Sequence, residues 1–129
     1  MDAIIEDSID YSPFKWGVND CCAHAAKILV NCGAPNFYED FDVKSESDAK
    51  KALLSMGCEN LYDLMLMIAA KHKWSEVPYK QSQSADVAIF KQADDFVVGV
   101  VKGGFVLAKT ANGIAGIPVE NALIIWRVL

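Results

Sequence analysis

The first half of the chain carries apolar residues three and four positions apart, the spacing of one face of an α-helix. This pattern predicts helices over residues 20–32 and 45–56, and a third that begins after Asn60. Gly33 and Gly57 are placed to end the first two helices. The positions expected to face the core are Cys22, Ala25, Ala26, Leu29 and Cys32, then Ala49, Ala52, Leu53 and Met56, then Leu61, Leu64, Met65 and Ile68.

From residue 85 the pattern changes to short runs rich in β-branched and aromatic residues, separated by turn residues. The expected strands cover residues 85–90, 96–102, 105–109, 114–119 and 122–129, and Gly103-Gly104 is a typical two-residue hairpin turn. Because the connections are short, the strands should run antiparallel. The order predicts one α+β domain over residues 1–129, with N-terminal helices packed on a C-terminal antiparallel sheet or a small curled barrel.

Composition and charge narrow the classes of function. The chain has 129 residues, and its 53% hydrophobic and 22% charged residues are typical of a globular domain. A net charge of −5 without a basic run argues against binding to nucleic acid. No apolar run reaches the length of a membrane span. Residues 1–10 contain acidic and no basic residues, unlike a signal peptide, so we expect synthesis in the cytoplasm.

The four cysteines have no spacing that indicates a cofactor. They are Cys21, Cys22, Cys32 and Cys58. A cytosolic origin disfavours disulfides, and the paired spacings typical of zinc sites do not occur. We therefore expect no metal and no cofactor.

The candidate chemistry lies at the start of the first predicted helix. Asn19 or Asp20 can cap this helix, which places the Cys21 thiol at the positive end of the helix dipole, where a thiolate is stabilised. The alternative is that Cys21 and Cys22 are small hydrophobic residues buried at a helix start. His24, three residues after Cys21, is a weak candidate base. A helical pair at this spacing rarely gives the required alignment, so His24 is expected mostly as a surface or edge residue.

Residues 13–22 read Pro-Phe-Lys-Trp-Gly-Val-Asn-Asp-Cys-Cys. They resemble the nucleophile region of the NlpC-type cell-wall peptidases of the papain-like superfamily. More closely, they resemble a phage and prophage family encoded among tail genes that opens with Pro-Phe-x-Trp-Gly-x-x-Asp-Cys. Looser similarities follow: Ala85-Asp86-Val87 stands where the superfamily has Gly-Asp-hydrophobic, and Trp126-Arg127 lies in the segment that resembles its terminal strand. The resemblance implies an NlpC-like fold with Cys21 as candidate nucleophile.

One departure from the superfamily affects the expected activity. Its catalytic histidine stands two residues before the glycine of a His-hydrophobic-Gly pattern, and the matching position here is Val97, before Gly99. Residues 105–108, in the next strand, offer no polar residue to orient a histidine. A cysteine hydrolase needs a base to take the thiol proton and later to protonate the leaving amine.

The resemblance and the missing histidine favour a pseudoenzyme: a structural or adaptor component of a phage tail tip or baseplate. Its expected partners are other tail proteins, its location the virion tail, and contact with peptidoglycan is a further expectation. One alternative is an active NlpC-type cysteine peptidase or amidase that cleaves peptidoglycan peptides during DNA entry. Another is a host enzyme unrelated to phage. Aromatic residues outside the periodic segments are candidate interface anchors: Phe37, Tyr38, Phe41, Trp74 and Tyr79.

Overall fold

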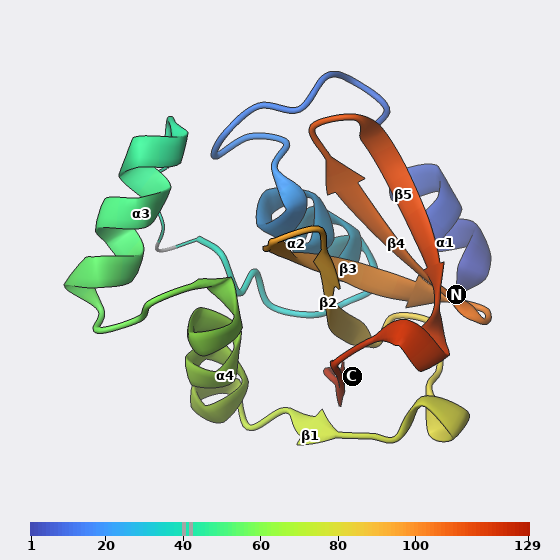
Figure 1. Cartoon of the computed structure of the whole chain (residues 1–129). Helices are drawn as coiled ribbons and strands as arrows, with labels where there is room; N and C mark the ends of the chain where they lie inside the picture. Colours follow the sequence, from blue (N-terminus) through green and yellow to red (C-terminus); the bar gives the residue numbers. More distant parts are fainter. Residues whose placement is uncertain (40, 42) are drawn as a thin grey trace.

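The computed structural model describes residues 1–39, 41 and 43–129 and confirms the α+β class (Figure 1). Helices dominate the first half of the chain and strands the second. The elements are α1 (Asp2–Ser8), α2 (Cys21–Asn31), α3 (Glu46–Ser55), α4 (Leu61–His72), β1 (Ser75–Glu76), the 3-10 helix η1 (Tyr79–Gln81), β2 (Val87–Gln92), β3 (Asp95–Lys102), β4 (Phe105–Thr110), β5 (Gly113–Pro118), the 3-10 helix η2 (Val119–Asn121) and β6 (Ile124–Arg127). In the described part of the chain, no helix is long and apolar enough to cross a membrane.

The strands form one six-stranded antiparallel sheet in the order β1-β6-β2-β3-β4-β5. The expected hairpins β2–β3, β3–β4 and β4–β5 are all present, and η2 leads the chain back so that β6 lies between β1 and β2. The alternative of a closed barrel is wrong for the described strands. Closure would need β1 to pair with β5, but β1 has only two residues, and both pair with β6.

The sheet has an apolar core on each face. Alternate residues of β2 point to opposite faces, as in any strand. Val87 and Ile89 join a helix-side cluster with residues of α1, α2 and α4, whereas Ala88 and Phe90 join a second cluster on the other face. The buried members of this second cluster are Ala88, Phe90, Val97, Val101, Val106, Ala108, Val119 and Ile125.

The predicted helices differ in how far they are buried. In α2, four of the expected core residues (Cys22, Ala25, Ala26, Leu29) are buried and Cys32 is half-buried. The inward stripe expected for α3 is only half-buried, and no α3 residue is buried. Figure 1 shows the reason, because α3 lies to one side of the sheet while α2 crosses its face.

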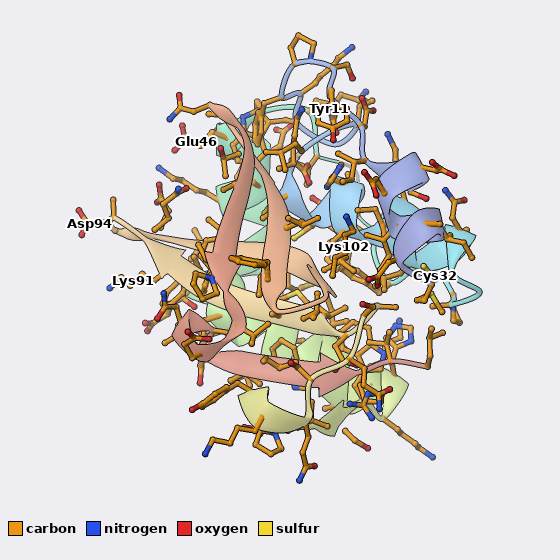
Figure 2. All side chains as sticks on the ribbon, turned by 90° about the vertical axis from the view of Figure 1, so that its right-hand side faces the viewer. Tyr11, Cys32, Glu46, Lys91, Asp94 and Lys102 are labelled. Carbon is orange, nitrogen blue, oxygen red and sulfur yellow. The ribbon has the colours of Figure 1, made fainter. Side chains whose placement is uncertain are left out.

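Among the α-helices and strands, two were not predicted. The helix α1 contacts α2 and contributes the fully buried Ile5, but it is too short to show a periodic stripe. The strand β1 has two exposed residues and therefore no pattern of its own. In Figure 2, Lys102 of β3 lies near α1, and its Nζ is 3.2 Å from the Glu6 carboxylate.

Gly99 fixes the path of β4 across β3. The pairing of these strands covers only Val100–Lys102 and Phe105–Leu107. A Cβ added at Gly99 would lie 2.5 Å from the Leu107 carbonyl oxygen and 2.8 Å from a Val106 methyl carbon. The close approach of β4 therefore requires glycine at this position.

We predict that Gly99→Ala lowers the free energy of unfolding by about 2–3 kcal/mol, because β4 must move to admit the methyl group. Urea unfolding followed by circular dichroism measures the change. The matched control is Gly104→Ala, since a Cβ at Gly104 meets no atom within 4 Å. A Gly99→Ala protein as stable as this control would show that β4 is not held against β3.

Candidate functional site

Cys21 is the first residue of α2, and α2 packs against β3 and β4. This confirms the prediction that Cys21 lies in the first turn of a helix on an antiparallel sheet. Of the two proposed capping residues, Asp20 is the cap, and its Oδ1 accepts a hydrogen bond from the Ala23 N–H at 2.8 Å.

The Asp20 carboxylate is buried and also holds the segments on either side of it. Its Oδ2 accepts the Gly17 N–H at 2.7 Å and the Tyr38 hydroxyl at 3.4 Å. Gly17 has φ +76°, and a Cβ there would lie 1.8 Å from the Val43 carbonyl oxygen. Trp16-Gly17 is therefore a tight turn packed against the segment after α2, and a side chain at residue 17 has no room.

The Cys21 sulfur is half-buried at the place where β3 and β4 separate. The pairing of these strands ends at Val100–Leu107, and the Val98 N–H lies toward the thiol. The pKa of Cys21 is lowered, first by a hydrogen bond from the Cys22 thiol, against the effect of burial, and then by the Val98 N–H. The pKa of Cys22 is raised well above its ordinary value by the same hydrogen bond and by burial. Of these two thiols, Cys21 is therefore the one that loses its proton first.

The wall beside the thiol is apolar. Cys21, at the start of α2, packs against both the helix-side cluster and the second cluster, and the second contains Val97. Val97 is 8% exposed, and Val106 and Ala108 of the next strand belong to the same cluster. Val97 stands at the position that the resemblance aligns with a catalytic imidazole, and among the described residues its cluster contains no proton acceptor.

His24 is not a surface or edge residue, as expected, but is buried with 1% exposure. Its Nε2 accepts the Asp10 N–H at 3.1 Å, which holds the segment before α2 against the helix. Burial, followed by the positive charge of Lys109, lowers the pKa of His24 from 6.5 to about 4. The imidazole is therefore neutral at pH 7, with its acceptor nitrogen engaged by the backbone.

The other histidine also has a place away from the thiol. His72, at the end of α4, stacks on Trp74 with 5.8 Å between the ring centroids. In the part of the chain that the structure describes, no hydrogen bond joins either imidazole to Cys21.

Sequence reasoning missed a buried amine next to His24. Lys109 of β4 is 2% exposed, and its Nζ donates to the Asp10 carbonyl at 3.0 Å and to the Ser12 carbonyl. Nearby, the buried Asn19 donates through Nδ2 to the Ser12 carbonyl at 2.8 Å, while its Oδ1 has no partner among the described residues. The expected strand pattern gave no signal for Lys109, because its partners are backbone carbonyls of a distant loop.

The two loosely matching motifs of the second half meet in space. Arg127 donates through Nε to Asp86 Oδ1 at 2.7 Å and through Nη2 to Oδ2 at 3.3 Å. Ala85, where the superfamily has glycine, has φ +75°. An open hollow of about 650 Å³ lies beside this pair and the chain ends, away from Cys21. Its arginine and carboxylate already bind each other.

Four of the five aromatic residues expected as interface anchors pack on the chain itself. Phe37 is buried, and Tyr38, Phe41 and Trp74 are half-buried against the helix-side cluster. These four residues contribute to the core of the chain, because the irregular segments that carry them lie over it. Tyr79, at 46% exposure, is the most exposed of the five, and the anchor interpretation stays a prediction.

The four cysteines are all free thiols. Among the described residues, no three histidine, cysteine or acidic side chains converge as a metal site would require. The site consists of a thiol, its vicinal partner and a capping carboxylate.

Comparison with protein families adds one relationship. Residues 2–128 match a family described as a domain of unknown function, DUF6950. The chain belongs to this family. No curated protein matches it in sequence. Since the family description names no activity, the site geometry carries the argument for function.

The burial of His24 predicts a stability that depends on pH. The unfolded chain takes up the proton near pH 6.5 and the folded chain only near pH 4. The contribution is therefore complete above pH 6.5 and is lost as the pH falls through 4, a loss of roughly 2–3 kcal/mol. Urea unfolding between these pH values measures it. The His24→Gln protein keeps an acceptor for the Asp10 N–H but has no group that titrates here, so its free energy of unfolding should fall by that much less over this pH range. If the free energy of unfolding falls equally in both proteins, His24 is not the group responsible.

The surroundings of the thiols predict different reactivities for two half-buried cysteines. The alkylation midpoint of Cys21 should lie below 9.0, because of the Cys22 and Val98 hydrogen bonds, and that of Cys32 above 9.0, because of burial. Asp20→Asn keeps a capping side chain but removes a charge that raises the pKa of Cys21. It should lower the Cys21 midpoint and leave Cys32 unchanged. Mass spectrometry after timed iodoacetamide pulses resolves both; a Cys21 midpoint at or above that of Cys32 would refute this picture.

Proposed function

We propose that this chain is a structural or adaptor component of a phage tail tip or baseplate, built on a degenerate NlpC-type cysteine peptidase fold. The observation that carries the proposal is the apolar environment of Val97. The nucleophile-like Cys21 packs against the same cluster as Val97, so the place of a catalytic imidazole is filled by hydrocarbon.

In the part of the chain that the structure describes, no imidazole lies beside the thiol, which limits what the thiol can do. Attack on an amide needs a group that protonates the leaving amine, because an amide anion is a very poor leaving group. His24 and His72 are engaged elsewhere, by the Asp10 N–H and by Trp74. A Cys21 thiolate can therefore attack a carbonyl carbon, but it has no imidazole beside it to protonate the departing amine as the thioester forms.

Three features support descent from a peptidase-like fold. Cys21 begins a helix that packs on the sheet, beside the strand that carries Gly99. The Asp86–Arg127 pair joins the sheet's first hairpin to its last strand. The required glycine geometry at Gly99 gives a physical reason for the glycine of the resembled motif.

The proposed location in the virion tail is based on the resemblance of residues 13–22 to the tail-gene family. Such a component binds other tail or baseplate proteins and acts without a cofactor. In this proposal any contact with peptidoglycan is binding without cleavage.

The alternative function is an active NlpC-type hydrolase of peptidoglycan peptides. The lowered pKa of Cys21, which the Cys22 thiol and the Val98 N–H favour, supports it. In that case a proton donor must come from the substrate or from a partner protein.

Incubation of the purified protein with peptidoglycan, followed by muropeptide analysis, separates the two functions. We expect no cleavage by the wild-type protein or by Cys21→Ala, because both imidazoles of the described chain are engaged away from the thiol. We also expect the chain in purified phage particles, detected by mass spectrometry. Cleavage that disappears in Cys21→Ala would favour the hydrolase, and absence from the particles would refute the tail component.

A further inference from the structure

We propose that β5 is a pairing edge at which a second copy of this chain binds, so that two sheets join into one across a two-fold axis. The outward-facing backbone N–H and carbonyl groups of β5 would bind the second copy through hydrogen bonds. This proposal does not depend on the proposed function.

The two edges of the sheet differ in protection. The edge strand β1 has two residues, includes the exposed Glu76 and is soon followed by Pro78. Short length, charge and proline are the usual protections of a sheet edge. The opposite edge, β5, has six residues and no charged side chain. In the described part of the chain no strand pairs with its outer side, and Figure 2 shows β5 beside β4 at the front of the molecule.

The register identifies which backbone groups of β5 point outward. The Val119 N–H donates to the Gly104 carbonyl at 3.0 Å, just beyond the Phe105↔Pro118 pair. Since alternate residues of an antiparallel strand bond to the same neighbour, Gly113, Ala115 and Ile117 face β4, and Ile114, Gly116 and Pro118 face outward. Proline has no N–H, so Ile114 and Gly116 are the outward residues that offer both a donor and an acceptor.

The backbone at this edge is open to solvent. Gly116 is exposed, and because it has no side chain, its exposed surface is that of the backbone. The other residues of β5 are half-buried. A strand can therefore approach Gly116 without displacing a side chain of this residue.

A second copy fits this edge because the two outward residues complement each other. With a two-fold axis at Ala115, Ile114 of each copy pairs with Gly116 of the other, and both exchange N–H and carbonyl hydrogen bonds. Gly116 leaves space for the Ile114 side chain of the second copy. That side chain would meet Leu107, whose Cδ2 lies 3.5 Å from a Cβ built at Gly116.

Charge also favours this arrangement. The chain carries a net charge of −5, so two copies repel each other at most orientations. The uncharged β5 brings no like charges together, and in this register Glu120 lies level with Thr110 of the second copy. Because edge pairing buries a small area, we expect a dissociation constant on the order of 10–100 µM.

Sedimentation velocity over a concentration series, from about 5 to about 500 µM, tests the dimer. We expect a monomer–dimer equilibrium whose dissociation constant rises at least tenfold in Gly116→Lys. Each lysine then lies opposite Ile114 of the other copy and diagonal to the second lysine, so the two like charges repel each other across the axis. Gly104→Lys is the matched control, a glycine with open space around it in the turn between β3 and β4. A monomer at every concentration, or equal effects of the two variants, would overturn the proposal.

A cysteine scan tests the register. Residues at 115 face each other at a non-hydrogen-bonded position, where the Cα atoms are about 4.5 Å apart, within disulfide range. Ala115→Cys should form a disulfide-linked dimer under mild oxidation, whereas in Ile117→Cys the new thiols lie opposite Gly113 and should not. Wild-type protein controls for the native thiols, and circular dichroism for folding. Equal crosslinking of the two variants would overturn the register.

Hydrogen exchange tests which partner binds β5. If the chain stays monomeric and its Ile114 and Gly116 amides gain protection from exchange only when another tail protein is added, the proposal of a second copy is overturned.

Discussion

The hydrogen bonds that the buried Asp20 carboxylate accepts are the interactions on which this structure most depends. It caps α2 through the Ala23 N–H, closes the turn before α2 through the Gly17 N–H, and accepts the hydroxyl of Tyr38. A buried carboxylate is stable only when such donors surround it. One side chain thus joins the entering loop, the central helix and the aromatic segment that follows. It also places Cys21 at the start of α2 while opposing the thiolate with its own negative charge.

The position of the thiol depends on the short pairing of β3 with β4. The start of α2 lies where these two strands separate, near the Val98 N–H. Within the described ranges, this arrangement supplies a donor to a thiolate but no imidazole, because the adjoining positions are Val97 and other members of an apolar cluster. The polar groups that a hydrolase would place there lie elsewhere. His24 and Lys109 bind the backbone of residues 10–12 and hold the entering loop in place.

The sequence predicted where Cys21 lies in the fold, but it predicted only part of the surroundings of this residue. The Asp-Cys start of a helix predicted where Cys21 would lie, since capping is local chemistry. His24 was misjudged because its burial depends on the loop at Asp10 and on Lys109, which lies far along the chain. The packing of Phe37, Tyr38 and Phe41 could not be read from the sequence for a similar reason. Their segments have no period, so only the folded chain shows that they lie over the helix-side cluster.

The sequence by itself determined the α+β order, the spans of α2, α3 and α4, the three hairpins and the apolar residue at position 97. These depend on periodicity, capping and turn residues within a few positions of one another. The tertiary structure decided that the sheet stays open, that β6 inserts between β1 and β2, and that Asp86 meets Arg127. It also decided which edge stays unprotected and that His24 is buried. Each of these depends on contacts between segments that lie far apart in the sequence, and the local pattern of residues does not determine which segments meet.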